Sequence, residues 1–351
     1  MAHRDCCRIL PPELLRRIAR NGNSRQRDAA LDTLAVDHTL RLGRATWQLL
    51  DSGERRGLLG LAGGLKQRSI YDAHGSEALP GRLVRAEGTA AGTDAEVNEA
   101  YDGLGATFDF FADVYDRNSI DDEGLHLEAS VHYGRRYDNA FWNGQQMVFG
   151  DGDADLFNRF TISLDVIAHE LTHGVTGDEA RLVYLGQAGA LNESISDVFG
   201  SLVKQYARKQ TADKADWLIG EGLFTAKVHG VALRSMKAPG TAYDDPVLGR
   251  DPQPATMDGY VHTSVDDGGV HTNSGIPDHA FYLAAMALGG HAWERAGRVW
   301  YETLRDKRMK PTATFRQFAR LTVQNAAHFF GTVEREAIAT AWAAVGIKTA
   351  G

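Results

Sequence analysis

Cysteine is nearly absent from this chain, because only Cys6 and Cys7 occur among its 351 residues. Two adjacent cysteines cannot build a disulfide framework, which excludes the class of small disulfide-stabilised secreted domains. Long apolar runs are also missing, and without a stretch of 18 apolar residues we expect no membrane-spanning helix. Positive charge is in deficit, since the formal net charge is −8, so we expect neither nucleic acid nor a membrane as a partner.

The first residues lack the basic segment followed by an apolar segment that marks a secretion signal. We therefore expect the protein to be cytoplasmic as synthesised, with secretion by a non-Sec route as the alternative.

The remaining composition is that of an ordinary globular protein, with 43% hydrophobic residues and enough length for two domains. Apolar spacing predicts a mixture of strands and helices up to about residue 184 and mainly helices after it. The fold class is therefore α+β followed by a helical domain, with the site in the cleft between them. The expected strands cover residues 82–85, 125–131 and 146–149, and the expected helices cover residues 94–115, 188–207, 276–288, 292–304, 314–330 and 333–345.

The segment with the most chemical content is His169-Glu170-Leu171-Thr172-His173. Histidines four apart share one face of a helix, so both imidazoles can bind one Zn²⁺ ion. Glu170 lies beside the first ligand, where a carboxylate can take a proton from the attacking water. Because five residues of this kind also occur by chance, a helix with two surface histidines stays open at this point.

A second candidate segment contains the acidic residues Glu193 and Asp197 and begins twenty residues after His173. Glu193 completes a set of two histidines and one glutamate, which is a common catalytic zinc shell. Asp197 lies one helical turn later and can accept the second ring N–H of His169. The apolar neighbours of this pair predict a buried helix, in which acids need partners.

A third candidate is the loop that contains Asp266 and His271. Two glycines between these residues predict a tight turn. His271 held by Asp266 is suited to donate a hydrogen bond to the oxyanion formed during peptide hydrolysis. A single loop histidine is more often without a function, so this candidate depends on the other two.

Together these segments resemble the thermolysin family of zinc endopeptidases, over about residues 70–347. The resemblance implies that Tyr184 and His271 stabilise the oxyanion, that Arg234 holds the substrate carbonyl after the cleaved bond, and that Asn139 and Ala140 belong to the edge strand that pairs with substrate. It also implies an apolar pocket for a bulky residue after the cleaved bond, lined by Phe157, Phe160, Val166, Ile219 and Leu233.

The N-terminal segment resembles the short prosegment of the protealysin-like subgroup, through Pro11, Pro12 and the leucines that follow. This implies a precursor with a helical propeptide and linker over residues 1–60, an α+β catalytic domain over residues 61–184 and a helical domain over residues 185–351. We expect self-cleavage before one of the leucines at 58, 59, 61 or 65 in a glycine-rich linker.

The prosegment is expected to inhibit its own catalytic domain, and two mechanisms are open. Pro11 and Pro12 can occlude the cleft beside Asn139 while presenting poor geometry for cleavage. Cys7 can instead supply a thiolate to the zinc ion. We prefer occlusion by the proline pair, because the reach of Cys7 cannot be judged from sequence.

One position departs from the calcium-binding members of the family, because Lys204 stands where they have a glutamate. An ammonium group provides no oxygen ligand and opposes Ca²⁺, although it can pair with carboxylates nearby. We therefore expect one catalytic Zn²⁺ and absent or reduced calcium.

The expected activity is that of a zinc endopeptidase acting on internal bonds of peptides and proteins. Two alternatives remain: a zinc exopeptidase, and a non-catalytic zinc-binding protein whose prosegment never leaves.

Overall fold

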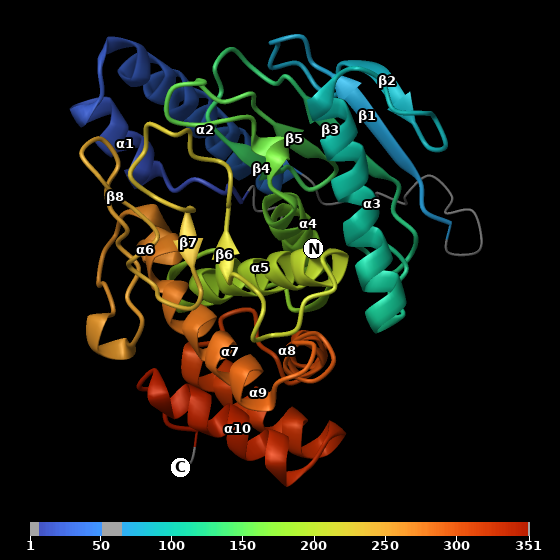
Figure 1. Cartoon of the computed structure of the whole chain (residues 1–351), viewed down its shortest axis with the longest axis vertical. Helices are drawn as coiled ribbons and strands as arrows, with labels where there is room; N and C mark the ends of the chain where they lie inside the picture. The colour runs from blue at the N-terminus through green and yellow to red at the C-terminus, as the bar shows by residue number, and fades with distance from the viewer. Residues whose placement is uncertain (1–6, 51–64, 350–351) are drawn as a thin grey trace.

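The computed structural model describes residues 7–50 and 65–349. Figure 1 shows the two N-terminal helices on one side of a small sheet and helix α3 (Ala95–Tyr115) on the other, with the C-terminal helices extending away from the sheet. Cys6 and the leucines at 58, 59 and 61 lie outside the described residues, whereas Leu65 is described and exposed. Self-cleavage in this linker therefore stays a prediction.

The prosegment forms two helices, α1 (Pro12–Asn21) and α2 (Ser24–Leu50). Proline begins α1 favourably, because the first turn of a helix needs no backbone N–H partner for that residue. The face formed by Leu14, Leu15 and Ile18 is buried, as the helical spacing predicts. This helix is therefore fixed to the rest of the molecule by its apolar side.

The N-terminal part is built on a five-stranded sheet with strand order β2-β1-β3-β5-β4. The pairs β1–β3 and β3–β5 are parallel, and the other two pairs are antiparallel. Strand β4 lies at the edge, so its outer side can pair with another segment. The strands are β1 (Arg68–Asp72), β2 (Arg82–Ala86), β3 (Leu127–Val131), β4 (Ala140–Trp142) and β5 (Met147–Phe149).

Two central helices, α4 (Leu164–Glu179) and α5 (Gly186–Ala207), lie below the sheet and carry most of the candidate site (Figure 1). They approach closely because α5 has Gly200 at the contact. A Cβ atom there would lie 2.5 Å from the carbonyl oxygen of Asp165. Helix α3 (Ala95–Tyr115) packs against the sheet, and the carboxylate of Asp94 caps its first turn.

The C-terminal part is mainly helical, as the sequence predicts, so the α+β class with a helical domain is confirmed. The start of one helix differs from the expectation: residues 292–295 form a turn, and α8 begins only after it. Ala292 and Trp293 are buried, so the apolar pattern that predicted a helix here comes from a buried turn. The helices are α6 (Asp266–Asn273), α7 (Gly275–Leu288), α8 (Ala296–Leu304), α9 (Phe315–Phe329) and α10 (Thr332–Ala344).

Short elements connect these parts. They are the strands β6 (Leu218–Ile219), β7 (Arg234–Ser235), β8 (Asp244–Asp245) and β9 (Gly249–Arg250), and the 3₁₀ helices η1 (Phe160–Ile162) and η2 (Met257–Gly259). Within the described ranges, no helix has the length and apolar character that crossing a bilayer requires.

Candidate metal centre and active site

The three predicted metal ligands converge on one point between α4 and α5. The Nε2 atoms of His169 and His173 are 3.1 Å apart, and each lies 3.5 Å from a carboxylate oxygen of Glu193. All three side chains are buried. Spacing along α4 brings the two imidazoles together, whereas Glu193 arrives from α5 because the two helices pack closely.

The outer nitrogen of each imidazole has its own acceptor. His169 Nδ1 lies 2.7 Å from Asp197 Oδ1, as predicted, and His173 Nδ1 lies 2.9 Å from Asn192 Oδ1. Sequence reasoning assigned no partner to His173, although the rule that a ligating histidine donates its other N–H applied to both rings. Asn192 directly precedes the predicted ligand Glu193, and this position in the sequence could have indicated it as the partner of His173.

The charges of this cluster fit a divalent cation. Burial lowers the pKa of His173 to about 3, so its ring is a neutral base with a lone pair to offer. Burial alone would raise the pKa of Glu193, but the neighbouring histidines and Arg234 outweigh it and hold Glu193 ionised. One carboxylate oxygen of Glu193 is buried without a hydrogen-bond partner. Two neutral nitrogens and an anionic oxygen are a donor set that suits Zn²⁺.

Glu170 is fully buried beside this cluster and is not one of the converging ligands. Its Oε2 accepts a hydrogen bond of 3.1 Å from the backbone N–H of Trp142, and its Oε1 has no partner. Burial, and then the charge of Glu193, raises the pKa of Glu170 well above its usual range. A carboxyl group with one oxygen fixed and the other available is suited to exchange a proton.

His271 and Tyr184 also contact Glu193. Asp266 accepts from His271 twice, at 2.7 Å from the ring Nδ1 and at 3.0 Å from the backbone N–H. Burial would lower the pKa of His271, but Asp266 and Glu193 reverse this effect and raise it to about 9. The predicted turn is present, because Gly268 and Gly269 adopt φ values of 90° and 74°. Tyr184 donates to Glu193, and its hydroxyl lies 3.2 Å from His271 Nε2.

The edge strand β4 is covered by the prosegment, which runs antiparallel to it. Ile9 donates its N–H to the carbonyl of Ala140 at 3.2 Å, and Leu10 donates to Asn139 Oδ1 at 3.0 Å. Arg234 donates to the carbonyl of Ile9 at 3.1 Å while its guanidinium is held by Asp197.

The residue before Ile9 faces the centre itself. The carbonyl oxygen of Arg8 lies 2.8 Å from His271 Nε2. The residues predicted to bind a substrate backbone thus bind the backbone of residues 8–10.

The predicted pocket residues belong to one buried apolar cluster that also contains Ile9 and Leu10. Leu233 and Arg234 line a cavity of about 30 Å³ together with Pro11 and Leu14. The other predicted lining residues are all buried: Phe157, Phe160, Val166 and Ile219.

The proline pair lies at the start of α1. Pro11 caps α1 and Pro12 begins it, so the residues on the strand are those that precede the prolines. Cys7 is buried, and its Sγ atom lies within 4.8 Å of ligand atoms of His173 and Glu193. Residues 8–10, and not the prolines themselves, lie on the strand beside Asn139, while Pro11 lines a cavity with Arg234 and His271. Occlusion of the cleft by the proline-bearing segment stays a prediction.

A buried ion pair inside the prosegment was not predicted. Arg8 Nε lies 3.0 Å from Asp37 Oδ1, and Asp37 also accepts from Asn139 at 3.3 Å and from the Tyr137 hydroxyl at 2.7 Å. Asp37 thus connects α2 both to Arg8 and to the edge strand. No local pattern signals a contact between residues 29 positions apart.

Lys204 occupies a second polar centre on the same two helices. Its Nζ lies 2.7 Å from Asp165 Oδ2, 2.8 Å from Asp216 Oδ1 and 2.7 Å from the carbonyl oxygen of Leu218. The pairing with carboxylates that the sequence suggested is present.

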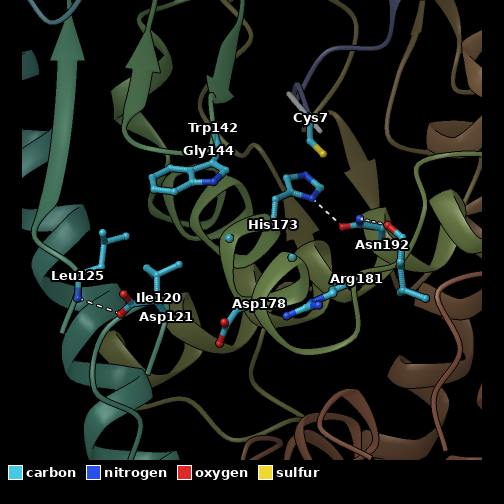
Figure 2. Close-up of a pocket in the computed structure, with 13 residues that line it drawn as sticks. Cys7, Ile120, Asp121, Leu125, Trp142, Gly144, His173, Asp178, Arg181 and Asn192 are labelled. Carbon is cyan, nitrogen blue, oxygen red and sulfur yellow. Dashed lines mark hydrogen bonds between the residues drawn. The ribbon is translucent and has the colours of Figure 1, made fainter. Parts of the chain in front are cut away.

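A cavity of about 240 Å³ opens beside the metal centre (Figure 2). Cys7 and His173 line one end of it, and Trp142 lies over another wall. Part of the cleft therefore remains accessible while residues 8–10 cover the strand.

Two family models match the chain: the thermolysin metallopeptidase catalytic domain over residues 33–177, and the thermolysin metallopeptidase alpha-helical domain over residues 180–347. The extracellular metalloprotease of Pectobacterium carotovorum subsp. carotovorum is 54% identical over 348 residues, which are 99% of this chain and 98% of that protein. The extracellular minor metalloprotease of Serratia marcescens is 42% identical over 307 residues, covering 87% of this chain and 84% of that one.

A solved structure gives the same result. The precursor of protealysin, a metalloproteinase from Serratia proteamaculans, has a TM-score of 0.89 and 55% sequence identity, over 97% of this chain and 99% of that chain.

These similarities correct one expectation. The prediction of a cytoplasmic protein is wrong, because the Pectobacterium and Serratia marcescens relatives are named as extracellular enzymes and point to secretion. The pattern of the first residues reports on one export route alone and did not decide the location.

Proposed function

The chain belongs to the thermolysin family of metallopeptidases and is a zinc metalloprotease in its precursor form, and from this premise we propose the roles of its individual residues. His169, His173 and Glu193 hold the metal, and Asp197 and Asn192 orient the two imidazoles. Zinc, which this family uses, lowers the pKa of a water molecule and polarises the peptide carbonyl when it is bound.

Glu170 acts as the general base and then as the general acid. It takes a proton from the attacking water and delivers it to the leaving amine. The observation that carries this proposal is the buried Glu170 Oε1, which has no partner while Oε2 is fixed by Trp142. The contact with Trp142 uses only one oxygen, so it leaves the burial of Oε1 without a structural explanation.

The oxyanion is stabilised by the donors beside Glu193. His271 is protonated at neutral pH and donates from Nε2, Asp266 fixes its ring, and Tyr184 adds a hydroxyl donor. Donors that are already oriented need no reorganisation as charge develops.

The substrate backbone is bound as residues 8–10 are bound in the precursor. Asn139 and Ala140 take the strand contacts, and Arg234 holds the carbonyl that follows the cleaved bond. The residue after that bond enters the apolar pocket of Phe157, Phe160, Val166, Ile219 and Leu233, so a bulky apolar side chain is preferred there.

The prosegment inhibits the enzyme by two contacts. Residues 8–10 occupy the substrate strand, and Cys7 lies beside the metal ligands, where its sulfur can occupy the position that water needs. The buried Arg8–Asp37 pair supports this arrangement by joining the segment to α2. Processing in the linker over residues 58–66 then releases the catalytic part, which we divide into residues 61–184 and 185–351.

Glu170→Ala tests the catalytic role. The variant should bind one zinc per chain and keep its unfolding midpoint, while turnover of an internally quenched peptide falls by roughly 10²–10⁴-fold or more. It should also remain full length when expressed in a protease-deficient host. Turnover above a tenth of wild type would refute the assigned base, and equal trimming of the variant would show that another enzyme processes the precursor.

A pair of variants separates the two inhibitory contacts. Cys7→Ser should raise the activity of the precursor and the rate of self-processing, because hydroxyl oxygen is a poorer zinc ligand than thiolate. Pro11→Ala combined with Pro12→Ala should act more weakly, through the start of α1. If only the proline variant were activated early, occlusion would be the dominant mechanism.

A further inference from the structure

The cavity in Figure 2 extends from the metal centre towards the side of the cleft that residues 8–10 do not occupy. The direction of the prosegment identifies this side. Along β4, Leu10 lies at Asn139, Ile9 at Ala140 and Cys7 at the Trp142 end. A substrate bound in the same direction places the residues that precede its cleaved bond in this cavity.

The cavity has room for a side chain, since its volume of about 240 Å³ is well above the roughly 10–15 Å³ that one water needs. Much of its lining is apolar, and three charged residues contribute to it: Asp121, Asp178 and Arg181. The charge that a ligand meets depends on which of these groups already has a partner.

Both acids are engaged. Asp178 Oδ2 lies 2.7 Å from the buried guanidinium of Arg117. Asp121 Oδ1 accepts the backbone N–H groups of Glu123 and Leu125 at 3.0 and 2.9 Å. Arg181 is exposed, and its guanidinium makes no hydrogen bond or ion pair within residues 7–50 and 65–349. Arg117 pairs with Asp178, whereas neutral backbone N–H groups leave the charge of Asp121 in place. Arg181 is the cationic group of the lining that has no partner among the described residues, so it is the group that can pair with an acidic ligand.

The backbone at Arg181 gives an independent indication. Arg181 directly follows Ala180, the C-cap residue of the zinc-site helix α4, and its N–H donates to the carbonyl of Thr176 at 2.8 Å. Its φ is 52°, the left-handed conformation that glycine adopts at a helix end without steric cost. An arginine is less favourable here than a glycine, because its Cβ atom is crowded in this conformation. Other non-glycine residues of this chain also adopt positive φ, so the backbone conformation agrees with a role for Arg181 at the rim of the cleft but does not establish one.

We propose that Arg181 is a specificity-determining residue that binds an acidic side chain of the substrate on the amino-terminal side of the cleaved bond. The proposal rests on the endopeptidase function proposed above. Asn192 supports the placement of this loop, because it donates to the carbonyl of Leu182 at 3.3 Å while accepting from His173. The loop that carries Arg181 is thus tied to a metal ligand.

The test uses the zinc-loaded, self-processed enzyme and paired internally quenched peptides. Each pair is identical except for Glu or Gln at the second, third or fourth residue before the cleaved bond. At one of these positions, kcat/KM should be about two- to fivefold higher for Glu, the range of a partly exposed ion pair, with the difference mainly in KM. The preference should shrink in 0.5 M salt.

Variants assign the preference to one side chain. Arg181→Gln should abolish the Glu-over-Gln ratio, Arg181→Lys should keep part of it, and Arg181→Glu should favour a Lys peptide. Arg335→Gln on α10 is a matched control, because Arg335 is an exposed arginine paired with Glu336 away from the cleft. Its ratio should equal that of wild type.

If both peptides were cleaved and the ratio of kcat/KM for Glu over Gln were the same in wild type and Arg181→Gln, this inference would be overturned and the proposed function would stand. Cleavage of neither peptide by the wild-type enzyme would overturn both. Because the measured quantity is a ratio within one protein, a loss of folded material in a variant does not change it.

Discussion

Helices α4 and α5 carry two polar centres that differ in where their cation comes from. At one, Asp165 and Asp216 surround the ammonium group of Lys204, which the chain itself provides. At the other, His169, His173 and Glu193 converge without a cationic side chain among them. The two centres are one helical turn apart on α4 and about three turns apart on α5.

The difference teaches how buried carboxylates are kept ionised. Burial opposes ionisation in both centres, and Coulomb attraction outweighs it in both. The ammonium group of Lys204 is part of the chain, so it neutralises the nearby carboxylates permanently but cannot activate a water molecule. Ligands that take their cation from solution give a centre that can activate water, at the cost of dependence on metal supply.

Chelation should separate the two centres most strongly. A zinc chelator such as 1,10-phenanthroline should abolish peptidase activity, because the base and the oxyanion donors then act without the metal. A calcium-selective chelator should leave both activity and the unfolding midpoint unchanged. A large loss of stability with the calcium chelator alone would break the comparison, since it would reveal a calcium site that Lys204 does not replace.

Removal of the ammonium group of Lys204 should lower the stability of the protein without removing its peptidase activity. Lys204→Met leaves the fully buried Asp165 without its partner, so the free energy of unfolding should fall by about 3–5 kcal/mol. Chemical denaturation measures the loss. The matched control is Lys214→Met, because Lys214 is exposed and its contact with Asp213 is 3.4 Å, and it should stay within about 0.5 kcal/mol of wild type.

Lys204→Glu sharpens the same comparison by exchanging the ammonium for an oxygen ligand. Millimolar Ca²⁺ should raise the unfolding midpoint of this variant, by mass action on a new site, and should barely affect the wild-type chain. A strong calcium response of the wild type would refute our expectation of reduced calcium binding.

A third polar centre contains His132, a cation whose charge depends on pH. His132 contacts Asp151, Glu96 and Asp94 at 3.0, 2.7 and 3.0 Å. Hydrogen bonds to Asp151 and Glu96 outweigh burial and raise the pKa of His132 to about 11. Its contribution to stability is therefore complete below pH 6.5, the value of a free histidine, and is lost as pH rises towards 11.

His132→Gln should lower the unfolding midpoint by about 3 °C at pH 6, and the gap to wild type should narrow by pH 10. His328→Gln is the control, because His328 is exposed on α9, and its midpoint should stay within about 1 °C at both values. A gap that widens with pH would mean that His132 contributes through packing and not through charge.

Much of the candidate site could be predicted because it depends on local periodicity. Two histidines four apart must share a helical face, and Glu193 and Asp197 share one for the same reason. The helix of Leu14, Leu15 and Ile18 and the turn at Gly268 and Gly269 are likewise properties of short segments. The assignment of Tyr184, Arg234 and Asn139 came from resemblance, since no local rule gives them a role.

The sequence by itself determined that His169 and His173 can bind one metal ion, because the 3.6-residue turn places both on one face regardless of the surrounding fold. The packing of α5 on α4 decided that Glu193 joins them. Only the tertiary structure decided that residues 8–10, and not the proline pair, lie on the edge strand. It also decided that Asp37 pairs with Arg8, that Asn192 accepts from His173, and that Arg181 lines the cleft without a partner among the described residues. The contact between Leu10 and Asn139 joins residues 129 positions apart, and the geometry follows from how α4, α5 and the sheet pack, which no local period encodes.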